Sequence, residues 1–198
     1  MHSTTLRSRP VRLLLSASLL TSLGLGSAFI SVHRSNDLRG EAVAPPPPPI
    51  SEDQAREQVV GAARQFVGAG RLTGRFTSAD GTYLLATCSN DNEPPYQGTG
   101  YLTFDVPTIT ETPAFFREIA RDMTGRGWRE GQSPAHHPGG KTLIKDSVIA
   151  QYYRDPNLPD RGVLQVYGEC RVVTDHRLDT TGFVDITAEL ARPAPGTP

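Results

Sequence analysis

The sequence predicts an α+β domain: an antiparallel sheet of about five strands with two amphipathic helices on one face, preceded by one N-terminal transmembrane or signal helix. Three observations predict this class. Two stretches repeat apolar residues with the period of a helix, several shorter stretches rich in β-branched and aromatic residues read as strands, and an uncharged run lies near the N-terminus. The order helix, two strands, helix, three strands favours an antiparallel sheet with both helices packed on one face.

The N-terminal segment predicts export. Residues 1–12 are a basic region with three arginines, and residues 13–32 carry no charge. Twenty such residues just span a bilayer core, so we expect a single-pass anchor with the N-terminus in the cytoplasm and the following domain outside. The Leu-rich run also resembles a secretory signal, and in that alternative the protein is secreted after cleavage at Ala28.

A Pro-rich linker is expected between the anchor and the domain, over residues 33–50. It contains five consecutive prolines, Pro45 to Pro49, which favour a polyproline II rod of about 15 Å. The position favours a spacer over a docking motif for a Pro-binding partner. The extracytoplasmic α+β domain then covers residues 51–192, and residues 193–198 form a tail expected to be disordered.

The domain is expected to begin with a helix. Ser51 and Gln54 have the spacing of a capping box, apolar residues follow at helical spacing, and Gly68 and Gly70 are expected to end the helix. A strand is expected over 82–88, followed by a polar loop.

A second strand and a second helix follow. In 100–106, Leu, Phe and Val alternate with Tyr, Thr and Asp, which indicates a strand paired antiparallel to the first. Thr112 as N-cap and Pro113 at the first helical position predict a helix that ends near Gly125 and carries a Phe-rich apolar stripe.

Three further strands complete the predicted sheet. We expect a short strand at 127–129, a loop over 132–140 with two Pro and two Gly, and longer strands over 146–154 and 162–173. A last apolar alternation at 183–186 is a candidate edge strand.

The two cysteines, Cys88 and Cys170, are expected to form one disulfide, because the domain is exported and holds one widely separated pair. Each lies in a strand-like run, so the bond is expected to tie two strand ends together. The alternative, a nucleophilic Cys, requires a free thiolate and is disfavoured by the oxidising compartment.

The order of features resembles a known group of proteins. A membrane-targeting start, the Ser51-capped helix, Cys88 after a strand, a Phe-rich helix before Gly127-Trp128, and a closing strand with Cys170 are together similar to uncharacterised exported proteins of actinobacteria, in particular mycobacterial LppA-like envelope lipoproteins. The resemblance implies an envelope location and no established reaction. The sequence departs from those relatives at the anchor, because no cysteine available for lipidation lies near the end of the hydrophobic run.

Charge and motifs exclude several function classes. The formal net charge is −1 without a basic excess in the domain, so no nucleic acid is expected as a partner. The common phosphate-binding, nucleophile and metalloprotease motifs are absent from the sequence. His136 and His137 lie next to each other in a loop, but a structural metal site needs about four ligands, so neither a metal nor another cofactor is expected.

The remaining signal is aromatic. Tyr152, Tyr153 and Tyr167 lie on strands expected to pair, and in a half-covered sheet one alternating set must face away from the helices and offers a possible binding face. We therefore expect a non-catalytic binding or accessory module that contacts a protein or another envelope component.

Two alternatives stay open at this stage. One is a structural subunit of a membrane complex. The other is an envelope hydrolase that uses acidic residues such as Asp91, Glu93 or Asp175, which would need two carboxylates about 5 to 9.5 Å apart in one pocket.

Overall fold

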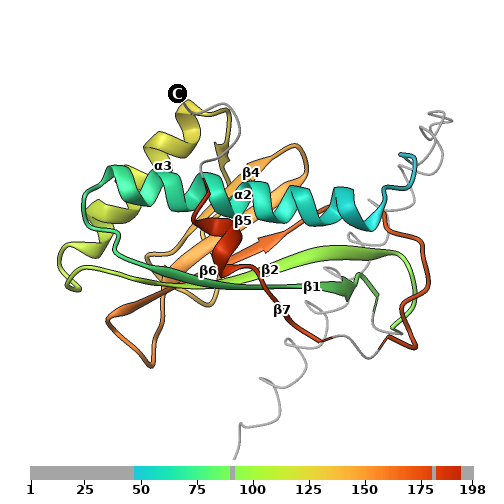
Figure 1. The fold of residues 1–198 in the computed structure, drawn as a ribbon. Coiled ribbons are helices and arrows are strands. Elements are labelled where there is room, and N and C mark those ends of the chain that lie inside the picture. The colour runs from blue at the N-terminus through green and yellow to red at the C-terminus, as the bar shows by residue number, and fades with distance from the viewer. Residues whose placement is uncertain (1–46, 90–91, 180–181, 193–198) are drawn as a thin grey trace, which may run out of the picture. The chain divides into compact units, whose positions relative to one another are not determined.

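A seven-stranded antiparallel sheet with three helices is formed by the residues that the structure describes, which are 47–89, 92–179 and 182–192 of this computed structural model (Figure 1). The helices and strands, in chain order, are α2 (Glu52–Leu72), β1 (Ala79–Thr87), β2 (Tyr96–Asp105), α3 (Thr112–Gly125), β3 (Arg129–Glu130), β4 (Lys141–Lys145), β5 (Val148–Arg154), β6 (Arg161–Tyr167), β7 (Val184–Asp185) and α4 (Thr187–Leu190). The expected α+β class with an antiparallel sheet is confirmed.

The strand order across the sheet is β3-β4-β5-β6-β2-β1-β7. The expected edge strand near 183–186 is present as β7, which pairs with β1. Strand β4 was missed, and with it the hairpin to β5, which turns at Asp146 and Ser147. These two residues have φ angles of 48° and 65°. The turn lacks the Asn-Gly or Asp-Gly pair that usually marks such a hairpin, so it has little local signature.

Helix α2 begins as expected and ends later than expected. The Ser51 side chain accepts a hydrogen bond from the Gln54 backbone, and Gln54 returns one to the Ser51 backbone. The expected end at Gly68 and Gly70 is wrong, because the helix continues to Leu72. Gly70 lies directly against the Phe76 ring, where a Cβ atom has no room, so this glycine serves close packing.

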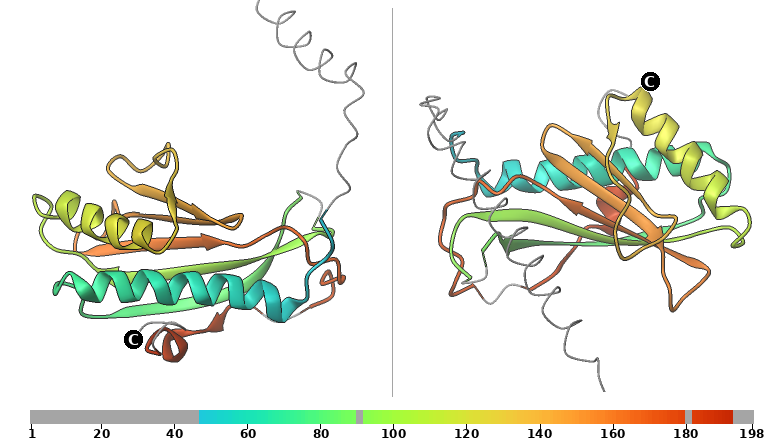
Figure 2. Two further views of the ribbon diagram at one scale, coloured as in Figure 1. Left: turned by 90° about the horizontal axis from the view of Figure 1, so that it is seen from above. Right: turned by 180° about the vertical axis from the view of Figure 1, so that it is seen from behind.

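All three helices lie on the same side of the sheet. Figure 2 shows α3 and α4 on either side of α2, with the strands behind them. Alternate residues of the strands point into this layer, and the ring of Phe66 on α2 lies 5.1 Å from that of Phe104 and 5.0 Å from that of Tyr152. The core is therefore a single layer between the helices and one face of the sheet.

Helix α3 presents the expected apolar stripe to this core, and its buried residues include Phe115, Phe116, Ile119, Ala120 and Met123. Its N-cap is Glu111, so Thr112 lies one position inside the helix. Helix α4 was not predicted, because four residues are too few to show a period. Its Glu189 forms a two-point ion pair with Arg56 of α2, with N–O distances of 2.6 and 2.8 Å.

Helix α2 approaches β2 closely, at two glycines. A Cβ atom on Gly98 would lie 2.7 Å from the carbonyl oxygen of Ala55, and one on Gly100 would lie 2.7 Å from a methyl carbon of Val59. The absence of side chains at these two positions is what lets the helix backbone settle on the strand.

The segments predicted at the two ends of the chain lie outside the described residues, namely 1–12, 13–32, most of the 33–50 linker, and 193–198. Among the helices of the described part, none has the length and apolar character needed to cross a membrane.

The crowded Gly98 and the open Gly68 predict opposite effects of the same substitution. We expect Gly98→Ala to lower the free energy of unfolding by about 1–3 kcal/mol, because the added methyl group pushes the α2 backbone away from β2. Gly68→Ala is the matched control: nothing lies within 4 Å of its added Cβ, and Ala should gain about 0.5–1 kcal/mol inside a helix. Urea unfolding of both variants measures this, and equal effects at the two positions would contradict the close packing.

Candidate functional site: the open face of the sheet

The three tyrosines proposed as a binding face do not all lie on one face. Tyr152 points into the core, is fully buried, and donates a hydrogen bond from its hydroxyl to the carbonyl oxygen of Phe116 at 3.1 Å. Its assignment to the binding face is wrong, because Tyr152 and Tyr153 are neighbours in a strand and must project to opposite faces.

Tyr153 does lie on the open face, but a loop covers it. The imidazole of His137 stacks on its ring with centroids 3.4 Å apart and planes within 3°. Only 7% of Tyr153 is exposed. His137 therefore covers the ring of this tyrosine. Among the described residues, no group of three His, Cys, Asp or Glu side chains is placed to hold a metal ion.

Tyr167 lies on the open face of the sheet. It is half-buried on the open face of β6, and its hydroxyl donates a hydrogen bond to the Gln165 side chain at 2.8 Å. Its backbone pairs with Thr99 of β2 on one side and with Ile149 of β5 on the other. Tyr167 thus sits in the middle of the sheet rather than at its edge.

A shallow hollow of about 480 Å³ opens beside Tyr167 on this face. Its walls are mostly apolar and come from three adjacent strands and the segment before β7, and the side chains that line it are Thr82, Leu84, Thr99, Tyr101, Gln165, Tyr167 and Phe183. Phe183 is 70% exposed and Tyr101 is 38% exposed. A concave apolar surface with a few polar groups is the usual form of a ligand-binding site.

Sequence reasoning missed Tyr101, Leu84 and Phe183. The signal for Tyr101 was present, because its strand alternates Leu102 and Phe104 with Tyr101 and therefore assigns it to the face opposite the core. Phe183 had no such signal, since the two-residue strand that follows it is too short to define a face.

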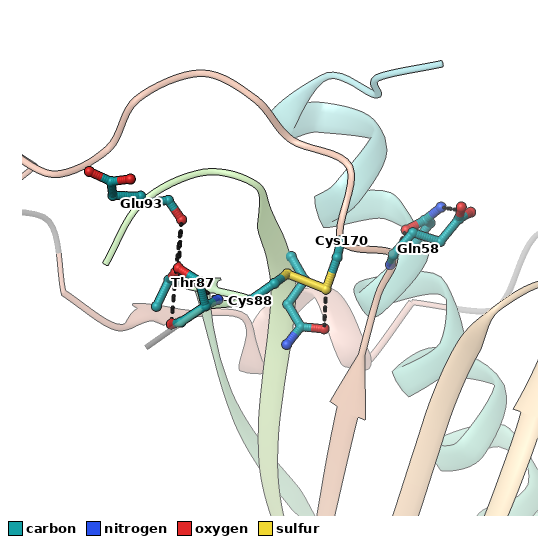
Figure 3. Close-up of a disulfide and its surroundings, with 8 residues drawn as sticks. Gln58, Thr87, Cys88, Glu93 and Cys170 are labelled. Carbon is teal, nitrogen blue, oxygen red and sulfur yellow. Dashed lines mark hydrogen bonds between the residues drawn. A yellow bond between two sulfur atoms is a disulfide. The ribbon is translucent and has the colours of Figure 1, made fainter. Parts of the chain in front are cut away.

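The structure joins Cys88 and Cys170 by a disulfide, with Cα atoms 6.1 Å apart. Figure 3 shows the bond between the residue that follows β1 and the segment that follows β6. The expected continuation of a strand to 173 is wrong, because β6 ends at Tyr167. Beside the bond, Gln58 of α2 donates to the Glu169 carboxylate at 2.8 Å, which fixes the same segment to the helix layer.

The end of the predicted linker is bound to this disulfide segment. Arg171 donates a hydrogen bond from Nε to the carbonyl oxygen of Pro48 at 2.7 Å, and the Ile50 backbone donates to the Arg171 carbonyl at 3.1 Å. Ile50 also packs on the small apolar cluster around Tyr96 and Val172. The chain that enters the domain is therefore held next to the disulfide before α2 begins.

The carboxylates considered for hydrolysis do not form an acid–base pair. Glu93 and Asp175 share one cation, Arg177, at 3.3 and 2.7 Å, and Asp91 lies outside the described residues. Hydrogen bonds and charge from Arg177 lower the pKa of Asp175. A general acid needs the opposite shift, so these residues act as a surface ion-pair network.

His176 lies between α2 and the C-terminal segment. Its Nδ1 is 2.7 Å from the Asp179 carboxylate, its Nε2 is 3.4 Å from Glu52, and the ring meets Tyr96 edge-on with centroids 5.1 Å apart. The two carboxylates face opposite ring nitrogens, so they orient the imidazole and fasten the segment rather than converge on one ion.

The described residues define a class of protein: a disulfide-linked α+β domain whose antiparallel sheet is covered by helices on one face only. The chain belongs to the LppJ family, described as "Putative lipoprotein LppJ", which matches residues 51–189. The proteins of that name from Mycobacterium tuberculosis and Mycobacterium bovis are 32% identical to this chain over 145 residues, 73% of each chain.

The expectation of a lipoprotein-like actinobacterial family is thereby confirmed in its general form, while the LppA-like resemblance in particular stays a prediction. Among solved structures, a DUF4853 family protein from Actinomyces odontolyticus matches with a TM-score of 0.40 and 12% identity, covering 67% of this chain and 75% of that chain.

The disulfide is expected to contribute substantially to stability. It closes a loop of 82 residues, for which the chain-entropy relation gives at most about 4.5 kcal/mol. We therefore expect the double variant Cys88→Ser, Cys170→Ser to unfold at a markedly lower urea concentration than the oxidised protein. The wild-type protein under a reducing dithiol is the control and should unfold like the double variant. Unchanged unfolding of the double variant would contradict the pairing as a source of stability.

Proposed function

We propose that this chain is a non-catalytic binding or accessory module of the cell envelope and that the open face of its sheet is the binding surface. The observation that carries the proposal is the apolar hollow around Tyr101. A stable sheet needs one buried face, which the helices supply here, whereas the aromatic hollow on the other face is apolar surface that the described residues leave exposed and that a partner would cover.

Membership of a family described as lipoproteins supports the envelope location. In this proposal residues 13–32 hold the protein in the membrane, the N-terminus stays in the cytoplasm, and the domain lies outside. The disulfide fits such a compartment, because exported domains form and keep disulfides that cytosolic thiol pools would reduce. Release after cleavage at Ala28 is the competing location.

The binding surface can be tested by site-specific photo-crosslinking of the full chain in membranes of its own host. With p-benzoylphenylalanine in place of Tyr101, we expect an adduct of reproducible mass. The same amino acid in place of Arg117, which is exposed on α3, should give none. Adding Leu84→Asp to the first variant should abolish the adduct without changing the unfolding midpoint, because a charge in the apolar hollow must be desolvated on binding. Equal adducts from both positions, or none, would contradict the proposal.

The location can be tested by intact mass after separation of membrane from medium. We expect full-length protein in the membrane fraction, and we expect Leu20→Arg to reduce that fraction strongly, because an Arg at the centre of a membrane helix costs about 3 kcal/mol. Ser18→Ala is the control and should leave the fraction unchanged. Wild-type protein found in the medium and starting at Phe29 would show that the segment is a cleaved signal.

A further inference from the structure

Two carboxylates border the aromatic hollow on the open face. Asp185 of β7 pairs with Thr82, and Asp80 of β1 pairs with Thr103. Both side chains line a second hollow of about 440 Å³, to which Tyr101 and Thr82 also contribute. Tyr101 and Thr82 belong to the first hollow as well, so Tyr101 stands between an apolar compartment and an acidic one.

The negative charge of the acidic compartment is not balanced by the described part of the chain. The Thr187 backbone donates a hydrogen bond to Asp185 at 2.8 Å, and this contact lowers the pKa of Asp185, which keeps the carboxylate ionised at neutral pH. Neither Asp80 nor Asp185 has a cationic side chain of the described residues within salt-bridge distance, in contrast to Asp105, which Arg161 contacts at 3.4 Å.

The spacing of the two compartments suits an extended peptide. Side chains two residues apart in a strand lie about 6.6–6.8 Å apart on one face. Strand β1 lines the apolar hollow with Thr82 and Leu84 and the acidic one with Asp80 and Thr82, so the midpoints of the two linings along β1 are two residues apart. An extended segment running along β1 would place alternate side chains in the two hollows.

We propose that the open face binds an extended segment of a partner protein in which an Arg or Lys, held by Asp80 and Asp185, lies two residues from an aliphatic or aromatic side chain that enters the apolar hollow. This inference rests on the proposed function and names the chemistry of its partner. Tyr101 lines both compartments, so its aromatic ring is placed to attract the cation as well.

Fluorescence polarisation with the full chain in lipid nanodiscs tests the inference. The probes are six labelled pentapeptides. Three are Ser-Phe-Thr-Arg-Ser, Ser-Phe-Thr-Glu-Ser, in which the charge is reversed, and Ser-Gly-Thr-Arg-Ser, and the other three have the same residues in the opposite order. We expect an Arg and Phe peptide, in one order, to bind at least 10-fold more tightly than its Glu and Gly counterparts. Its affinity should fall with added salt, because the contact is between exposed charges.

Variants assign the effect to the two carboxylates. Asp80→Asn with Asp185→Asn should weaken the Arg and Phe peptide by roughly 5- to 10-fold and remove its advantage over the Glu peptide. Asp160→Asn, a single Asp-to-Asn change in the β5–β6 loop, should leave both affinities unchanged. Equal binding of the Arg and Glu peptides, or an unchanged advantage in the double variant, overturns the inference.

The outcomes separate this inference from the function on which it rests. Binding that ignores charge but is lost in Tyr101→Ala overturns the cationic partner and leaves an apolar binding face. No binding of any peptide overturns the proposed segment, and if the Tyr101 crosslink is also absent, the binding face itself is rejected.

Discussion

The fold depends on the close contact between α2 and β2. Gly98 and Gly100 remove the side chains that would hold the helix away, and the 21-residue helix then lies across the middle of the sheet. Because β2 is a central strand, this contact fixes which face becomes the core, and α3 and α4 add to the layer that α2 starts. The opposite face is left without a helical cover in the described part of the chain. Its exposure is a consequence of the same packing that provides most of the buried apolar area.

A second constraint acts at one end of this layer. The segment that follows β6 receives the disulfide at Cys170, a hydrogen bond from Gln58 at Glu169, and the incoming chain at Arg171. Three separate parts of the sequence are therefore joined within three consecutive residues. A force on the incoming chain would be passed first to this junction and, through the disulfide, to the end of β1, rather than to the isolated N-terminus of α2.

The elements that could be predicted from the sequence are those with a repeated apolar pattern. The features that depend on pairing between distant residues were harder to predict. Helices α2 and α3 and the strands around Tyr83, Leu102 and Val166 follow from local patterns, because each pattern is repeated over several residues. The short strands β3, β4 and β7 are stabilised by their neighbours: β4 left no recognisable pattern, whereas short strands near β3 and β7 were expected from brief local signals. The same limit applies to the site. The alternation of a strand predicts that only one of Tyr152 and Tyr153 faces away from the helices, but which of the two it is depends on the face that the helices cover, and local pattern does not determine that.

The open face has features that stability does not require. Exposed aromatic surface gains nothing until it is covered, and two carboxylates without a cation repel each other on the folded protein more than in an extended chain. Several other acids of the described residues are paired with a cation, as Asp175 is with Arg177 and Glu189 is with Arg56. The combination of an apolar hollow and unpaired acids in one place therefore has a small cost in the free protein, and a complex in which both are satisfied would recover it. A complex that covers the hollow and pairs the acids is the state that we propose for these residues, and for that reason the proposed function is placed on this face.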